Sequence, residues 1–185
     1  MFSKRVRLAA TAAVLGVAGF TAAAVAGGGR DFETDLNGFE EVPSVSTIAG
    51  GAMSAEIDRA GTEIHYVLSW RNLEALPTQA HIHLGQEDAA GGISVWLCDS
   101  ATNPSPRETT PGCPQSQSAS VSGVIRAADV VGPVNQGIAG GEFNELVRAM
   151  RAGVTYANVH SQKFGPGEIR GQFDRDHGDR DSDDN

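Results

Sequence analysis

The sequence has few cations, only two cysteines and none of the common motifs for phosphate binding or nucleophilic catalysis. Its 185 residues carry 14 Lys and Arg against 23 Asp and Glu, so the formal net charge is −9 at pH 7. Because no basic patch is available to attract phosphate groups, a nucleic-acid-binding protein is disfavoured. The sequence also lacks a phosphate-cradling glycine loop and a Ser or Cys nucleophile with a positioned base. Hydrolase and nucleotide-dependent functions therefore find no support.

One long apolar run is present, and it lies near the start of the chain. Residues 8–26 are almost wholly Ala, Val, Leu, Gly and Phe, and three cations precede them. This profile is typical of an export signal, and Ala24-Val25-Ala26 matches the small-x-small pattern of signal peptidase sites. We therefore predict a signal peptide over residues 1–26, a flexible linker over 27–30 and a secreted or periplasmic mature chain without a membrane span. An uncleaved anchor is the weaker alternative, because the run is rich in Ala and Gly.

The two cysteines, Cys98 and Cys113, enclose a stretch rich in Pro, Ser, Thr and Asn. In an oxidising compartment such a pair predicts one disulfide bond that closes a long loop. A metal site with two cysteine ligands is the weaker alternative. In the chain-entropy model, closing a loop of about 15 residues contributes about 3 kcal/mol to the free energy of unfolding.

Several segments between residues 50 and 173 have the pattern of short strands, and the period-two alternation of half-buried strands is clearest in 52–58, 64–70 and 93–98. Glu142 to Ala152 differs, because its apolar residues recur at helical spacing and Gly153 follows the last of them. The pattern predicts an all-β domain over residues 31–173, a β-sandwich with one short helix. The expected strands are 52–58, 64–70, 78–84, 93–98, 116–126, 154–160 and 168–173.

The chain ends in an acidic segment, residues 174–185, which holds six Asp and two Arg and no apolar side chain. Such a segment cannot bury enough surface to offset the entropy cost of ordering it. We predict a disordered tail here. It lacks the Gly and the closing Glu of a calcium-binding loop, and its histidine, His177, is given little weight as a ligand.

Three histidines form a candidate metal site. His81 and His83 lie two residues apart on one predicted strand, so their side chains share a face, and His160 ends a distant strand. Copper and zinc both accept imidazole nitrogen, and three such ligands would leave an open coordination position. The alternative is that these histidines only make local hydrogen bonds. The metal hypothesis requires the fold to bring His160 beside the other two.

Other side chains near these segments have less specific interpretations. Glu168 and Arg170 share a strand face, which first suggests a structural ion pair. The alternative places Arg170 beside the histidines, where it draws a small anion toward a metal. Trp70 and Trp96 are predicted to belong to the core, and His65 to the solvent side or the rim of the sheet.

Four blocks of sequence, in this order, closely resemble the chordin-type (CHRD) domain. They are Asn37-Gly38-Phe39-Glu40-Glu41-Val42-Pro43, Ala80-His81-Ile82-His83-Leu84-Gly85, Tyr156-Ala157-Asn158-Val159-His160 and Gly167-Glu168-Ile169-Arg170-Gly171-Gln172. The resemblance spans about residues 31–173. It implies an extracellular Greek-key β-sandwich, similar in architecture to copper/zinc superoxide dismutase or to immunoglobulin-like domains. In animals this domain occurs in a secreted antagonist of growth factors.

The observations leave three functions open. The first is an exported module that binds copper, or zinc as second choice, through His81, His83 and His160. The second is a non-catalytic adhesion or protein-binding module that uses the loops Gln86–Gly92 and Ser100–Gln117. The third is a copper-only enzyme that resembles superoxide dismutase. Dismutases share the H-x-H and a later histidine, but this sequence shows neither their metal-bridging histidine nor their zinc loop.

Overall fold

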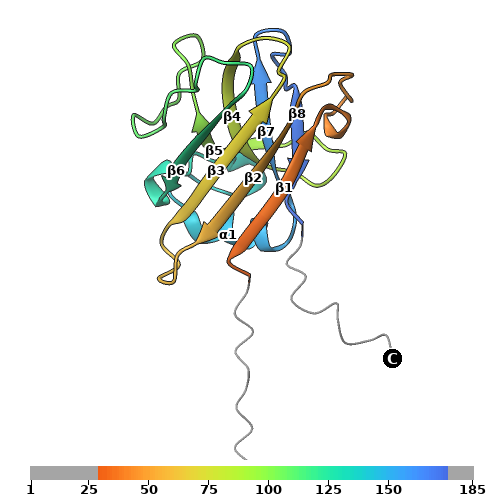
Figure 1. The fold of residues 1–185 in the computed structure, drawn as a ribbon. Helices are drawn as coiled ribbons and strands as arrows, with labels where there is room; N and C mark the ends of the chain where they lie inside the picture. The colour runs from red at the N-terminus through yellow and green to blue at the C-terminus, as the bar shows by residue number, and fades with distance from the viewer. Residues whose placement is uncertain (1–28, 175–185) are drawn as a thin grey trace, which may run out of the picture.

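Eight antiparallel strands and one short helix make up residues 29–174, the part of the chain that this computed structural model describes (Figure 1). The strands are β1 (Asp31–Asn37), β2 (Gly50–Ile57), β3 (Ile64–Arg71), β4 (Pro77–Leu84), β5 (Gly92–Cys98), β6 (Ala119–Ile125), β7 (Thr155–Ser161) and β8 (Ile169–Gln172), and the helix is α1 (Phe143–Arg151). Short 3-10 turns occur at Gly38–Glu40, Ala127–Asp129 and Val134–Gln136. The predicted signal peptide lies outside the described residues, as do His177 and nearly all of the predicted acidic tail.

The strands follow one another in the order β5-β4-β7-β8-β1-β2-β3-β6, and every neighbouring pair is antiparallel. β1 and β8 share only one register pair, Asn37 with Arg170, so the sheet folds there into two four-stranded halves. The connections β3 to β4, β5 to β6 and β6 to β7 cross between these halves, and the last of them contains α1. The result is a nearly closed sandwich, as the all-β prediction expects.

Alternation of buried and exposed side chains explains how the half made of β1, β2, β3 and β6 packs against the core. In β2 and β3 every second residue is buried, and Met53, Leu68 and Trp70 are 0–3% exposed. The core prediction for Trp70 is therefore confirmed, as is the solvent-side prediction for His65. β1 was not among the predicted strands, because its sequence is polar and sends only two apolar side chains into the core.

The helix closes the lower end of the sandwich as drawn in Figure 1. Five of its nine residues are buried, and they lie along one face, which agrees with the predicted helical spacing. Gly153 follows the helix with φ +67°, a left-handed conformation that favours glycine. In the described part of the chain, no helix is long and apolar enough to cross a membrane.

The predicted disulfide bond joins Cys98, the last residue of β5, to Cys113. The backbone N–H of Cys113 donates to the carbonyl of Asp99, and the N–H of Asp99 donates to the carbonyl of Pro111. The long loop between the cysteines is therefore closed by backbone hydrogen bonds as well as by the covalent bond. At the other end of the domain, the carbonyl of Arg30 accepts a hydrogen bond from Ile57, so sheet pairing already begins within the predicted linker.

Candidate metal site

β4 and β7 bring the three predicted histidines together. The two strands are antiparallel neighbours, with His81 opposite Asn158 and Gln79 opposite His160. The residues that alternate with the histidines, among them Ile82 and Val159, are fully buried in the hydrophobic core. The histidines therefore project from the other face of this half of the sheet. The register of β4 against β5 shifts on either side of the pair His81-Ile82.

The three imidazole rings lie close enough to share one ion. One nitrogen from each of His81, His83 and His160 falls in a group whose members all lie within 4.8 Å of one another. The shortest separation joins His81 Nδ1 to His160 Nε2, at 3.1 Å. The three residues are only 0%, 8% and 6% exposed. His160, which is distant in the sequence, thus forms one buried cluster with His81 and His83.

Backbone carbonyls orient two of the rings. His83 Nδ1 lies 2.9 Å from the carbonyl of Gly91, and His160 Nδ1 lies 2.8 Å from the carbonyl of Gly165. A carbonyl oxygen can only accept, so Nδ1 carries the proton in both rings and Nε2 keeps its lone pair. In metal proteins, a hydrogen bond from the second ring nitrogen commonly fixes the ligating histidine in this way.

Two of the buried ring nitrogens have no hydrogen-bond partner among the described residues, namely His81 Nε2 and His83 Nε2. An unsatisfied buried polar group costs about 1–3 kcal/mol of stability. A cation held by the cluster would use the lone pair that His83 presents. The donor set, three neutral imidazoles close together and shielded from solvent, fits a copper or zinc ion.

Burial keeps the cluster neutral. Desolvation, together with smaller effects of the neighbouring His160 and His83, lowers the pKa of His81 to about 2. Desolvation also lowers the pKa of His83 to about 4, against the opposing effect of its hydrogen bond to Gly91. The pKa of His160 is lowered by burial too. At neutral pH, protons therefore do not compete with a metal ion for these rings.

Two aromatic side chains flank the histidines. The Trp96 ring meets the His81 ring edge to face, with centroids 4.3 Å apart. The Tyr156 ring stacks on the His83 ring at 4.8 Å, with 3° between the planes. The prediction that Trp96 belongs to the core is wrong, because this residue is half-buried and lies on the histidine face of β5. It shields His81 instead.

The predicted Glu168–Arg170 ion pair does not form. Glu168 Oε1 accepts hydrogen bonds from Thr47 Oγ1 and from the backbone N–H of Glu74. The Arg170 guanidinium donates to the carbonyls of Gln86 and Ala89 and to the Gln172 side chain. Both side chains are buried, and loops that pass over this face supply partners that a strand-phase argument could not anticipate.

Sequence reasoning missed several residues of the site. Tyr156 and Asn158 precede His160 at period two, so extending the strand phase backward from His160 would have found both. Glu41 was missed, and its Oε1 accepts a 2.6 Å hydrogen bond from Asn158 Nδ2. Gly91 acts through its backbone carbonyl, which leaves no side-chain signal in a sequence.

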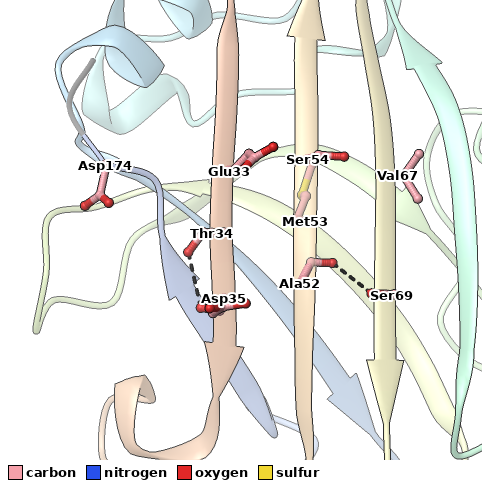
Figure 2. A pocket seen from close by; sticks show the side chains of 9 residues that line it. All are labelled: Glu33, Thr34, Asp35, Ala52, Met53, Ser54, Val67, Ser69 and Asp174. Atoms are coloured by element: carbon pink, nitrogen blue, oxygen red, sulfur yellow. Dashed lines mark hydrogen bonds between the residues drawn. The ribbon is translucent and has the colours of Figure 1, made fainter. Parts of the chain in front are cut away.

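A shallow hollow of about 450 Å³ crosses the opposite outer face, over β1, β2 and β3 (Figure 2). Thr34 Oγ1 donates to the carbonyl of Asp35, and Ser69 Oγ donates to the carbonyl of Ala52, so these hydroxyls serve the local backbone. No histidine or cysteine lines this hollow. Its residues are Glu33, Thr34, Asp35, Ala52, Met53, Ser54, Val67, Ser69 and Asp174. The three-histidine cluster is therefore the better candidate for a functional site.

We compared the sequence with known proteins and with models of protein families. The chain matches no curated protein and no solved structure. The CHRD domain model matches residues 32–173, which include all eight strands except the first residue of β1. The match covers most of the sequence and contains all three clustered histidines. The chain belongs to the CHRD domain family.

Proposed function

We propose that this protein is an extracytoplasmic metal-binding module that holds one copper ion, with zinc as second choice, through His81, His83 and His160. One observation carries the proposal: three neutral, buried imidazoles converge, and backbone carbonyls hold the proton of His83 and His160 on Nδ1, so that Nε2 carries the lone pair in both rings. The Nε2 of His83 has no hydrogen-bond partner among the described residues, and the Nε2 of His160 lies 3.1 Å from His81 Nδ1 within the cluster. CHRD domains are extracellular modules, and the disulfide bond is consistent with export. Copper ranks first because divalent copper binds a given nitrogen site more tightly than zinc does.

The three protein ligands would leave a coordination position open, and a copper ion there could be stored, delivered or cycled between oxidation states. The chain's own residues exclude water from the rings, through Trp96 and Tyr156, and hold the tautomers of His83 and His160. A dismutase-like activity has less support. Arg170, the candidate for steering an anion, uses its donors on carbonyls and on Gln172.

An adhesion module has weaker support from the loops. The segment Gln86–Gly91 is bound by Arg170 and Tyr156 and so serves the histidine face. The loop Ser100–Gln117 borders an open groove that includes Pro77, Ser100 and Gln115, and a partner could contact it. No described contact identifies such a partner. Metal binding therefore stands first.

Copper binding should quench the fluorescence of Trp96. The centroid of its ring lies 4.3 Å from that of the His81 ring. Trp70, in contrast, is buried in β3, and its Nε1 donates a hydrogen bond to the carbonyl of Ser116. A fluorescence titration with Cu²⁺ should reach its end point at one equivalent, and Zn²⁺ should compete without comparable quenching. In Trp96→Phe the remaining Trp70 emission should change little. Quenching of equal size in Trp96→Phe would place the copper elsewhere.

Copper affinity should stay nearly constant between pH 7 and pH 5. The pKa values of about 2 for His81 and about 4 for His83 mean that these ligands need not lose protons in this range. Exposed histidines with a pKa near 6.5 would be largely protonated at pH 5 and would bind far more weakly. Competition titrations at pH 7, 6 and 5 measure this. A fall of tenfold or more per pH unit below 6.5 would show that the ligands are solvated histidines.

A further inference from the structure

Arg170 is a buried cation with an unusual set of partners. It is 2% exposed, and no carboxylate of the described residues lies within salt-bridge distance of it. Its Nη1 donates to the carbonyl of Ala89 at 3.1 Å, and its Nη2 donates to the carbonyl of Gln86 at 2.9 Å and to Gln172 Oε1 at 3.1 Å. Burying a charge that has no direct ion pair costs free energy, so the hydrogen bonds and the ring contact of Arg170 must offset this cost.

The backbone that Arg170 binds leads directly to His83. Gln86 and Ala89 belong to the segment between β4 and β5 that ends at Gly91, whose carbonyl accepts the hydrogen bond from His83 Nδ1. A Cβ atom on Gly91 would lie 1.7 Å from the carbonyl oxygen of Leu84, so only glycine fits this close approach. The position of the Gly91 carbonyl therefore depends on how this segment is held.

A second route joins Arg170 to the same ring. The Arg170 guanidinium lies over the Tyr156 ring, 3.6 Å from its centroid, and Tyr156 stacks on His83. Because β7 lies between β4 and β8, Tyr156 separates Arg170 from His83. The Tyr156 hydroxyl also accepts a hydrogen bond from the backbone N–H of Gly91 at 3.0 Å. The stack sets the plane of the His83 ring, and the segment sets its tautomer.

We propose that Arg170 is a positioning residue for the three-histidine site: it holds the segment Gln86–Gly91 and the Tyr156 ring so that His83 presents its Nε2 lone pair to the metal. This inference rests on the proposed function, because it assumes that the three histidines bind a metal. The contacts of Arg170 described above explain how it would orient His83. A planar guanidinium can reach two carbonyls and stack on a ring at once, and the ammonium group of Lys cannot. The chemistry favours Arg at this position for that reason.

The test compares Arg170→Lys with Arg107→Lys. Arg107 is a half-buried arginine that likewise donates to a backbone carbonyl, that of Val130, and in the described structure it makes no hydrogen bond or cation–π contact with Tyr156. Metal-free protein is studied first, by long-range ¹H–¹⁵N correlation of the histidine rings. In the wild type and in Arg107→Lys, His83 should be a single Nδ1–H tautomer with a slowly exchanging proton. In Arg170→Lys the exchange should be at least tenfold faster, and the second tautomer should appear.

Copper affinity is the second measurement. Loss of a residue that orients a ligand costs about 10- to 100-fold in metal affinity, which is the expected effect of Arg170→Lys. If Arg170→Lys does not fold, Arg170→Gln, which keeps one amide NH2 group and removes the charge, replaces it. An unchanged His83 tautomer and exchange rate in a folded Arg170 variant would overturn this inference. Failure of the wild type to bind copper would instead overturn the proposed function, and the metal-free spectra would still decide the role of Arg170.

Discussion

Replacing His83 with alanine is expected to weaken copper binding about 100- to 1000-fold. Structural zinc sites with four ligands bind with about 10–16 kcal/mol, so each ligand contributes roughly 2.5–4 kcal/mol, which corresponds to about this range. The double variant His81→Ala/His83→Ala should lose stoichiometric binding altogether. Isothermal titration against a competing chelator measures both effects.

The control for this prediction is His65→Ala. His65 lies on β3, is exposed and pairs with Glu63 at the surface, so its loss should leave copper affinity within about twofold. Circular dichroism and denaturant unfolding of the metal-free variants separate loss of ligand from loss of fold. Wild-type affinity in a folded His83→Ala protein would show that the copper is not bound by this cluster.

The second large effect concerns Glu41, which should limit stability at alkaline pH. The residue is 9% exposed, and desolvation raises the pKa of its carboxyl from 4.5 to about 7, despite the hydrogen bond from Asn158 and the charge of Arg170. The folded state therefore binds more protons than the unfolded state between pH 4.5 and 7. The stability that the protonated carboxyl contributes is fully present below pH 4.5 and is lost as pH rises through 7.

Glu41→Gln mimics the protonated acid at every pH. The amide oxygen can still accept the hydrogen bond from Asn158, and no charge is buried. The variant should be about 2–3 kcal/mol more stable than the wild type at pH 8 and nearly equal to it at pH 4.5. Urea unfolding at the two pH values measures the difference.

The neighbouring acid supplies the control for Glu41. Glu40 is exposed, so Glu40→Gln should change stability little at either pH. A Glu41→Gln protein that gains no stability between pH 4.5 and pH 8 relative to the wild type would contradict the account. It would mean that the Glu41 carboxylate is well solvated or is paired when folded.

The sequence carried enough information to predict the sandwich and the cluster of histidines. Alternation in β2 and β3 follows directly from one buried face, and the H-x-H spacing places two imidazoles on one face of β4. His160 could be added because its strand was also evident. Local periodicity thus predicts which face of a strand each side chain occupies, because that depends on the strand alone.

Features that depend on loops could not be predicted. Arg170 and Glu168 share a strand face, yet loop groups supply their hydrogen-bond partners, so no ion pair forms. The position of Trp96 in the strand pattern suggests a core residue. The histidine side of the sheet is also covered, however, and the Trp96 ring packs there against His81. The carbonyls of Gly91 and Gly165 select the tautomers of His83 and His160. Every residue has a backbone carbonyl, so the sequence does not indicate which ones contact the histidines.

The metal content of the folded protein tests the central claim most directly. The protein is equilibrated with copper, freed of excess ion by gel filtration and analysed by elemental mass spectrometry beside His81→Ala/His83→Ala. We expect one copper per wild-type chain and none in the double variant. Wild-type protein that folds and retains less than a tenth of an equivalent, or a double variant that retains a full equivalent, would contradict it.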